Sequence, residues 1–242
     1  NLNEIIGRTD LLRQVSLGGS NLDDLDLNPL LVQADPGENK RYCSSNLINK
    51  VPSNLDEKIY NDIKNSIVKK RKIELNYNVQ NVHRAVGTRL SHYIYNLFNK
   101  EKLEKNSIII NLTGSAGQSL GAFGVTGLKL NVIGDANDYV AKGLSGATIV
   151  IKPPNESNLI SDENTIIGNT VLYGATSGKL FASGQSGERF SVRNSGAESV
   201  IEGCGSNGCE YMTGGVVAIL GKVGDNFAAG MTGGIAFVYD PN

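Results

Sequence analysis

The sequence predicts a mainly β protein: a right-handed parallel β-helix of about seven coils, preceded by a helical and irregular N-terminal segment. Three observations lead to this fold class. Of the 29 glycines, 24 lie in residues 106–242, so the composition changes near residue 105. In this second part a Ser/Thr-Gly pair recurs at intervals of 18 or 19 residues, with one longer interval. After each pair apolar and polar residues alternate, which indicates strands with one buried face.

Residues 1–78 are interpreted as a linker with helical parts that leads from an upstream domain. Residues 5–12 are predicted to be helical, and residues 55–67 form a second predicted helix capped by Ser53 or Asn54. Residues 18–50 have little periodicity and resemble an ordered linker lying along another domain. Residues 79–105 hold an amphipathic helix, predicted over 79–98, and its connection. We expect this helix to cover the first coil.

Residues 106–242 form the predicted glycine-rich β-helix. A degenerate first copy of the repeat fits residues 107–114, and a polar insert around 153–164 accounts for the long interval. Glycine adopts positive φ angles without a Cβ clash, so we expect it at the corners of the coils. The predicted structural corner glycines are Gly127, Gly146, Gly178, Gly196, Gly214 and Gly233. Between the corners, second short strands are predicted at 138–140, 170–173, 189–192 and 226–228.

Composition excludes several classes of protein. The net charge is −1 and 19% of the residues are charged, which argues against disorder and gives no electrostatic reason to expect nucleic acid as a partner. No apolar run approaches the ~18–20 residues that span a bilayer, and the polar N-terminus is not a signal peptide. Three cysteines make a disulfide framework improbable and fit a reducing compartment. We therefore expect an intracellular protein.

No motif of the chain predicts catalytic, cofactor-binding or metal-ligating residues. The segment 114–121 resembles a phosphate loop but lacks the Gly-Lys-Ser/Thr ending. Cys204 and Cys209 have no second pair to complete a metal site, so a structural role is favoured. Asp135 and Asp138 are a close carboxylate pair, for which turn capping is the preferred interpretation.

Four arginines are candidates for interface contacts. Arg84 and Arg89 lie on the predicted cap helix, while Arg189 and Arg193 flank Phe190 in one coil. Because the guanidinium group pairs with carboxylates or carbonyls through two parallel hydrogen bonds, these residues predict contacts within the domain or across an interface. No nucleophile and base accompany them, since residues 99–242 contain no histidine.

The chain is similar to the C-terminal domain of the glutamate synthase large subunit. The similar segments follow one another in order and include HRAVGTRLSHYI (83–94), GSAGQSLGAF (114–123), IIGNTVLYGATSGKLFASGQSGERFSVRNSGA (166–197) and NFAAGMTGGIAFVYD (226–240). Residues 6–12 and 25–31 resemble the segment that joins the family's flavin domain to its β-helix. The resemblance thus covers nearly the whole chain.

This resemblance implies a part of an oxidoreductase that converts glutamine and 2-oxoglutarate into two glutamates. The family's cysteine amidotransferase and its barrel with FMN and a 3Fe-4S cluster are expected in the parent, with no cofactor in this chain. The implied role is a structural scaffold, inactive by itself, whose partners are the other domains and, through the parent, a small subunit or ferredoxin. The implied location is the cytoplasm, or the plastid stroma in an organelle.

Alternative interpretations remain open at this stage. A related β-helix occurs in a subunit of formylmethanofuran dehydrogenase. Hexapeptide-type acyltransferases also have coils of near 18 residues, but they need a strict six-residue aliphatic repeat that is not visible here. A carbohydrate-active β-helix enzyme is the third alternative. Acyl-CoA turnover or calcium-dependent polysaccharide cleavage would favour the latter two.

Overall fold

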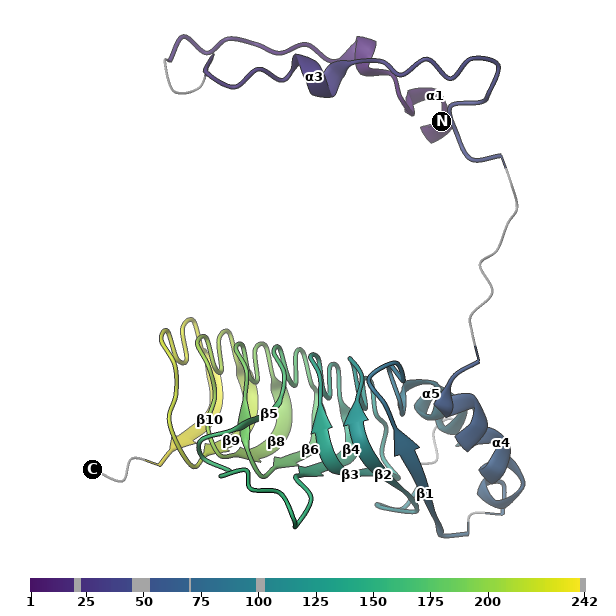
Figure 1. The fold of residues 1–242 in the computed structure, drawn as a ribbon, viewed down its shortest axis with the longest axis vertical. Helices are drawn as coiled ribbons and strands as arrows, with labels where there is room; N and C mark the ends of the chain where they lie inside the picture. Colours follow the sequence, from purple (N-terminus) through teal and green to yellow (C-terminus); the bar gives the residue numbers. More distant parts are fainter. Residues whose placement is uncertain (20–22, 45–52, 70, 99–102, 240–242) are drawn as a thin grey trace. The chain divides into compact units, whose positions relative to one another are not determined.

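The computed structural model describes residues 1–19, 23–44, 53–69, 71–98 and 103–239. The chain divides into two compact units, residues 1–52 and residues 53–242 (Figure 1). Each is described by itself.

Among its described residues, the first unit has the three short helical elements named next and no buried residue. They are α1 (Leu2–Ile5), the 3-10 helix η1 (Thr9–Leu11) and α3 (Asn28–Leu31). Asn1 starts α1 in a capping box with Glu4. The continuous helix predicted over 5–12 is wrong, since the chain leaves helical geometry at Ile6 and η1 holds only one turn. Apolar side chains of this unit, among them Leu2 and Leu30, remain exposed.

The second unit begins with α4 (Leu55–Ile67), where the sequence predicts a helix. The Asn54 side chain accepts a hydrogen bond from the Glu57 N–H, at 3.0 Å, and so caps the helix. Ile59, Ile63 and Ile67 recur at helical spacing and are fully buried. This prediction is confirmed, with Asn54 as the cap.

Ten parallel strands form one sheet, in the order β1-β2-β3-β4-β6-β8-β9-β10, with β5 paired to β3 and β7. Their bounds are β1 Ile73–Val79, β2 Ile108–Ala116, β3 Leu128–Ala136, β4 Ser145–Lys152, β5 Thr165–Ile167, β6 Ser177–Ala182, β7 Gln185–Ser186, β8 Ser195–Ile201, β9 Thr213–Ile219 and β10 Gly233–Val238. The mainly β, parallel architecture is therefore confirmed. The strand order runs from β1 to β10 without closing on itself.

The core lies on the inward face of this sheet. Along β2 the residues Ile108, Ile110 and Leu112 are buried, and the residues between them are partly exposed. Their partners on β3 in parallel register, Leu128, Leu130 and Val132, are buried as well. Apolar residues of neighbouring strands therefore lie next to one another along the stack. Phe190, in a segment between two strands, is among the largest fully buried side chains.

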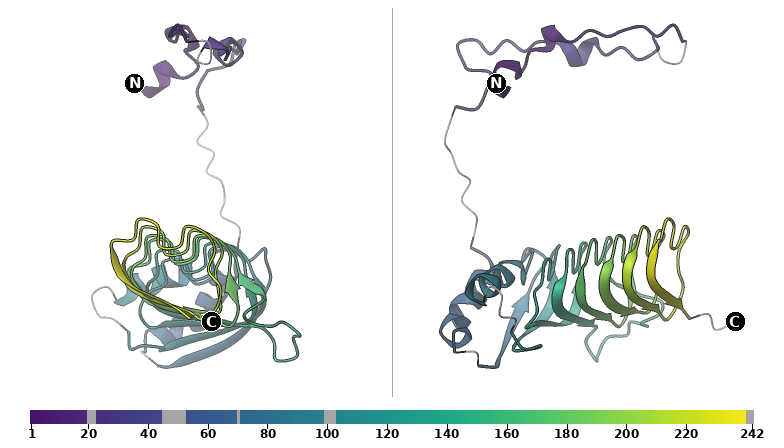
Figure 2. Two further views of the ribbon diagram at one scale, coloured as in Figure 1. Left: turned by 90° about the vertical axis from the view of Figure 1, so that its left-hand side faces the viewer. Right: turned by 180° about the vertical axis from the view of Figure 1, so that it is seen from behind.

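The segments between the strands stack into a second feature, which we name the turn ridge. Figure 1 shows it as the row of zigzag loops along one edge of the second unit, and the loops superimpose when seen along the stack (Figure 2, left). We define it by residues 84–87, 118–123, 138–143, 169–174, 188–193, 206–211 and 225–230. In each segment alternate residues have positive φ angles, for example Tyr139, Ala141 and Gly143.

Backbone hydrogen bonds join neighbouring segments of the turn ridge. The Tyr139 N–H donates to the Asn169 carbonyl at 2.8 Å, and the Ala141 N–H donates in the opposite direction to the Leu120 carbonyl at 2.9 Å. The prediction of second short strands at 138–140, 170–173, 189–192 and 226–228 is therefore wrong, because alternating left-handed residues form successive turns there. A β-strand and a segment of the turn ridge both bury apolar residues of a short run, so the pattern of apolar residues in the sequence does not distinguish between them.

The start of the second unit also differs from the prediction. Strand β1 lies within the segment interpreted as linker, and it pairs in register with β2. Helix α5 (Thr88–Phe98) begins nine residues later than predicted, because residues up to Val79 belong to β1 and residues 84–87 form the first segment of the turn ridge. Its buried residues Leu90 and Ile94 join the core cluster. Helices α4 and α5 lie at the β1 end of the sheet (Figures 1 and 2).

Candidate functional site

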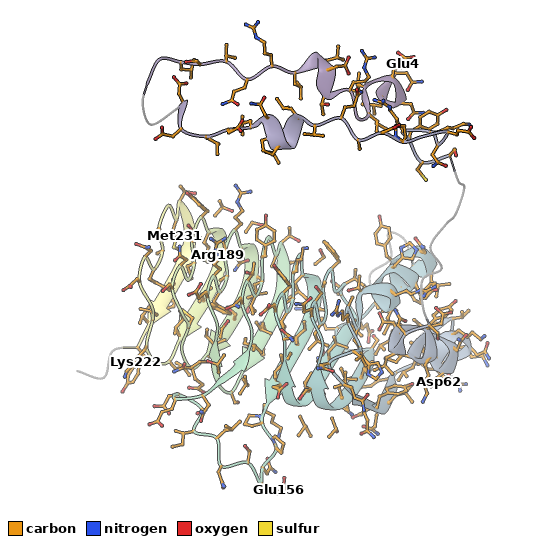
Figure 3. The ribbon with its side chains drawn as sticks, turned by 45° about the horizontal axis from the view of Figure 1, so that its top comes forward. Glu4, Asp62, Glu156, Arg189, Lys222 and Met231 are labelled. Carbon is orange, nitrogen blue, oxygen red and sulfur yellow. The ribbon has the colours of Figure 1, made fainter. Side chains whose placement is uncertain are left out.

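The turn ridge carries two of the four candidate arginines. Arg189 and Arg193 are exposed, and their backbone N–H groups donate to the carbonyls of Ser206 and Glu210 in the next segment. Figure 3 labels Arg189 on this edge of the second unit. Among the residues that the structure describes, neither guanidinium has a hydrogen-bond or ion-pair partner. Both groups are therefore available to an external carboxylate or carbonyl.

Aromatic side chains share the ridge with these cations. Four are among the exposed large side chains of the protein: Phe123, Tyr139, Tyr173 and Tyr211. The ammonium group of Lys142 lies 5.6 Å from the centroid of the Tyr139 ring. Arginine and tyrosine are the side chains that most often dominate binding at protein interfaces. The ridge is thus suited to contacts with another protein surface.

The other two arginines are placed differently. Arg84 is exposed in the first segment of the turn ridge. The Arg89 guanidinium forms an ion pair with Glu57 at 3.1 Å, and its Nε donates to the Tyr93 hydroxyl at 3.1 Å. Arg89 therefore contacts α4 within the domain. Arg84 is separated from Arg189 by several segments of the ridge, so the structure does not bring the four arginines together.

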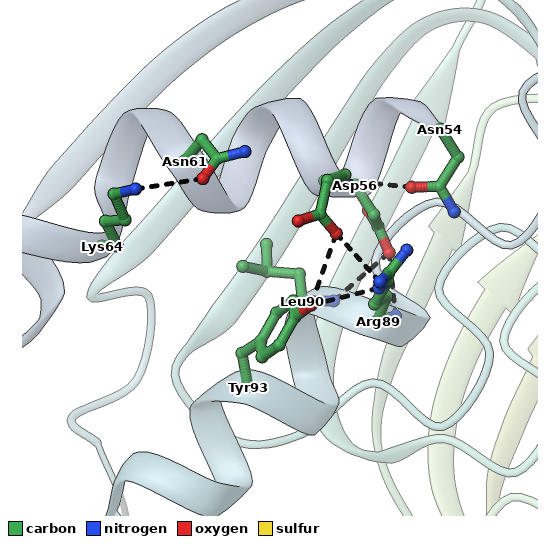
Figure 4. Close-up of polar contacts among 8 residues, drawn as sticks. Asn54, Asp56, Asn61, Lys64, Arg89, Leu90 and Tyr93 are labelled. Atoms are coloured by element: carbon green, nitrogen blue, oxygen red, sulfur yellow. Dashed lines mark hydrogen bonds and ion pairs between the residues drawn. The ribbon is translucent and has the colours of Figure 1, made fainter. Parts of the chain in front are cut away.

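Asp56 on α4 joins the two helices at the β1 end and was not singled out from the sequence. Its carboxylate accepts hydrogen bonds from the backbone N–H groups of Arg89 at 2.8 Å and Leu90 at 3.3 Å (Figure 4). It also accepts one from the Gly87 N–H at 2.6 Å. These donors lie at the start of α5, where N–H groups lack partners within the helix. Burial raises the pKa of Asp56, and the three N–H donors oppose this shift. An acidic residue in the first turn of a helix is normally expected to interact with the N-terminus of that same helix. Its position in the sequence therefore does not reveal that Asp56 bonds to the start of α5.

The predicted corner glycines lie within one residue of the starts of the main strands. Gly127, Gly146 and Gly178 have positive φ angles, as expected of corners. Gly196, Gly214 and Gly233 do not. A Cβ atom there would collide with the carbonyl oxygens of Thr176, Ser195 and Thr213, which lie within one residue of the starts of the preceding main strands. Close approach of two backbones, not a turn conformation, therefore requires glycine in the second group.

The remaining sequence candidates take part in local structure. Asp138 accepts a hydrogen bond from the Asn169 N–H at 2.8 Å, and Asp135 accepts one from the Ser115 hydroxyl at 3.2 Å. Cys204 and Cys209 are buried, and burial raises the pKa of their thiols to about 11 and about 12. Within the described ranges, no group of three or more potential ligands from His, Cys, Asp and Glu could hold a metal ion.

Among the described residues, no helix has both the length and the apolar character needed to cross a bilayer.

Comparison with known proteins places the repeat in a defined family. The profile of the GXGXG motif family matches residues 56–242. The chain belongs to this family. Its relatives in the GXGXG motif family include the "Glutamate synthase [NADPH] large chain" of Azospirillum brasilense, 63% identical over 99% of this chain. The "Glutamate synthase [NADH]" of Schizosaccharomyces pombe is 46% identical, and the "Ferredoxin-dependent glutamate synthase 2" of Synechocystis is 45% identical, each over 99% of this chain.

The chain spans only a small part of each of these GXGXG relatives: 16%, 11% and 16% of their lengths, respectively. The resemblance to glutamate synthase large chains is confirmed, and the chain corresponds to a segment of them.

Proposed function

We propose that this chain is a structural scaffold domain of a glutamate synthase large chain and contributes no catalytic residue itself. The parent would convert glutamine and 2-oxoglutarate into two glutamates. The scaffold would hold the amidotransferase and the FMN-dependent synthase domains in register. The main support for this proposal is the continuous series of paired parallel strands from β1 to β10. It occurs in a chain that is similar along 99% of its length to a glutamate synthase large chain. Such a series of strands fixes the distance between its two ends.

We also infer that the second unit winds as a right-handed parallel β-helix of about seven coils over residues 106–242. The turn ridge supports this inference, because its segments lie between successive main strands and are hydrogen-bonded from one repeat to the next. In this proposal residues 79–105 supply the cap helix and its connection, and residues 1–78 lead from an upstream domain.

The 3Fe-4S cluster, one of the two cofactors of the proposed parent, does not fit the described residues. A cluster of this kind is held by cysteine thiolates. Cys43 lies in the first unit, while Cys204 and Cys209 are buried thiols whose pKa is raised. We therefore assign the cluster to another domain of the parent.

The proposed partners are the amidotransferase and FMN barrel domains and, through the parent, a small subunit or ferredoxin. Arg189 and Arg193 would contribute to the contacts with these domains. The proposed location is the cytoplasm or the plastid stroma.

The test uses a full-length glutamate synthase that contains this segment. The variant Arg189→Glu with Arg193→Glu is compared with Arg71→Glu, an exposed arginine outside the ridge. We expect the ridge variant to keep its thermal unfolding temperature but to hydrolyse more glutamine for each 2-oxoglutarate consumed. If both variants hydrolyse as much glutamine for each 2-oxoglutarate consumed as the unmodified protein does, the turn ridge has no role in the domain contacts. Stoichiometric binding of FMN or 2-oxoglutarate by the chain alone would refute the scaffold itself.

A further inference from the structure

Residues that pair with one another from strand to strand form rows across the sheet. One such row on the outward face is polar at one end of the stack and apolar at the other. At the β1 end it consists of Asn76, Asn111 and Asn131. Their side chains form a chain of hydrogen bonds of 2.9 and 2.8 Å. An amide ladder of this kind is compatible with water.

The same row continues with apolar residues. It runs through Val150, Phe181, Val200 and Ala218 to Phe237 on β10. The neighbours of each of the first four along its strand are buried. These side chains therefore point away from the core, on the face where a solvated sheet is polar.

The row ends in a surface that we name the apolar corner: Val216, Leu220, Ile235, Phe237 and Tyr239. The exposed fractions of these side chains range from 41% to 60%. In Figure 1 this corner lies at the end of the stack opposite α4 and α5. An exposed apolar patch of adjacent residues marks an interaction site more often than scattered apolar residues do.

Strand β10 also lacks charged residues and proline, two of the features that protect a free edge. In the described part of the chain it pairs only with β9, and neither strand contains a charged residue or a proline. Edge strands that face water are usually guarded by lysine, proline or a bulge. The register shift between β10 and β9 lies at the start of β10, between Gly233 and Ile235, and regular pairing continues from Ile235 to Val238. On the inward face, Val238 is 41% exposed, whereas its register partner Ile219 is fully buried. The inward face of β10 thus lacks the cover that the inward face of β9 has.

We propose that the apolar corner docks against an uncharged, apolar surface in another part of a glutamate synthase large chain. The inference rests on the proposed function, which makes this chain one domain of such a protein. The chain spans 16% of the length of the relative from Azospirillum brasilense, so the larger part of such a protein lies outside the structure and can supply this surface. The absence of charge from β9 and β10 disfavours an ionic partner.

The test measures the accessibility of the corner in a full-length large chain containing this segment. Ile235→Cys places a thiol in the apolar corner, and Asn78→Cys places a matched thiol on the exposed outward face of β1. Maleimide labelling of each site is followed by peptide mass spectrometry. We expect Ile235→Cys to react at least about tenfold more slowly than Asn78→Cys, because it reacts only when the docked surfaces separate. Equal rates at the two sites would overturn the proposal.

The identity of the occupant is tested by dilution. Contact within one chain is independent of protein concentration, so the protection should persist on hundredfold dilution. Protection that is lost on dilution would indicate a second copy or a separate protein and would overturn the proposed occupant. Coupling of glutamine hydrolysis to 2-oxoglutarate consumption, measured on both variants, reports on the scaffold role separately. If glutamine hydrolysis remains coupled to 2-oxoglutarate consumption while the thiol of Ile235→Cys reacts freely with maleimide, the docking of the apolar corner is refuted and the proposed scaffold function is not.

Discussion

Replacing Asp56 by alanine should loosen the helical end of the second unit. The carboxylate accepts three backbone N–H bonds from Gly87, Arg89 and Leu90, and the side chain is almost completely buried. Each buried donor left without an acceptor costs about 1–3 kcal/mol, and partial relaxation reduces the sum. We therefore expect Asp56→Ala to lower the free energy of unfolding of this end by about 3–5 kcal/mol.

The assay is denaturant unfolding followed by tyrosine fluorescence, because Tyr60 and Tyr93 stack across α4 and α5 with ring centroids 3.9 Å apart. Asp62→Ala is the matched control on the same helix. It removes the acceptor of one exposed hydrogen bond, from the Tyr77 hydroxyl at 2.8 Å. We expect that control to cost about 0.5–1.5 kcal/mol. An Asp56→Ala variant no less stable than Asp62→Ala would refute the assignment of Asp56 as the bond between α4 and α5.

The pH dependence of the same residue has a defined sign. Burial raises the pKa of Asp56 above its ordinary value of 3.8, so the folded state holds the proton more tightly than the unfolded state. The resulting stabilisation is present below the unfolded pKa and is lost as the pH rises through the folded pKa. Relative to the non-titrating variant Asp56→Asn, the native chain should therefore lose stability over that window. A gain in relative stability over the same window would show that the N–H donors outweigh desolvation.

The remaining predictions concern the core, the turn ridge and the thiols. Phe190→Ala removes a fully buried ring and should lower the free energy of unfolding by about 3–5 kcal/mol, measured by denaturant titration. Gly143 and Gly174 occupy equivalent left-handed positions, but a Cβ atom would lie 2.5 Å from the Phe123 ring at Gly143 and would meet nothing within 4 Å at Gly174. Gly174→Ala should cost about 1–2 kcal/mol, Gly143→Ala more, and adding Phe123→Ala should remove the difference. At pH 8 iodoacetamide should modify the exposed Cys43 well before Cys204 and Cys209, because burial raises the pKa of those thiols to about 11 and about 12. Equal modification of all three in the folded chain would contradict their burial.

Much of the sheet could be predicted because its information is local. A Ser/Thr-Gly pair followed by alternating apolar residues marks β4, β6, β8, β9 and β10, and the alternation needs no distant contact to be recognised. Helix α4 has its cap at Asn54 and its apolar residues at helical spacing. Strand β1 alternates apolar and polar residues as the other strands do, but it was missed because no Ser/Thr-Gly pair precedes it and it lies outside the glycine-rich part of the chain.

The candidate site was only partly predictable. Arg189 and Arg193 could be selected because arginine is scarce in the chain, but their exposure depends on the ridge beneath them. Arg89 resembles them in sequence and differs only because Glu57 and Tyr93 lie within reach after folding. The apolar corner was not recognised, because its members belong to strands whose outward face is known only from the register.

The sequence by itself determined the family, the mainly β parallel architecture and the positions of most strands, because repeat period and alternation are properties of short segments. Only the tertiary structure decided what lies between the strands. Residues such as Tyr139 and Leu172 adopt left-handed backbone angles, which are unfavourable for residues with a side chain. Hydrogen bonds to the neighbouring segments of the turn ridge compensate for that cost. The same holds for Asp56, whose three donors come from residues more than thirty positions away. Interactions of this kind exist only once the repeats have stacked.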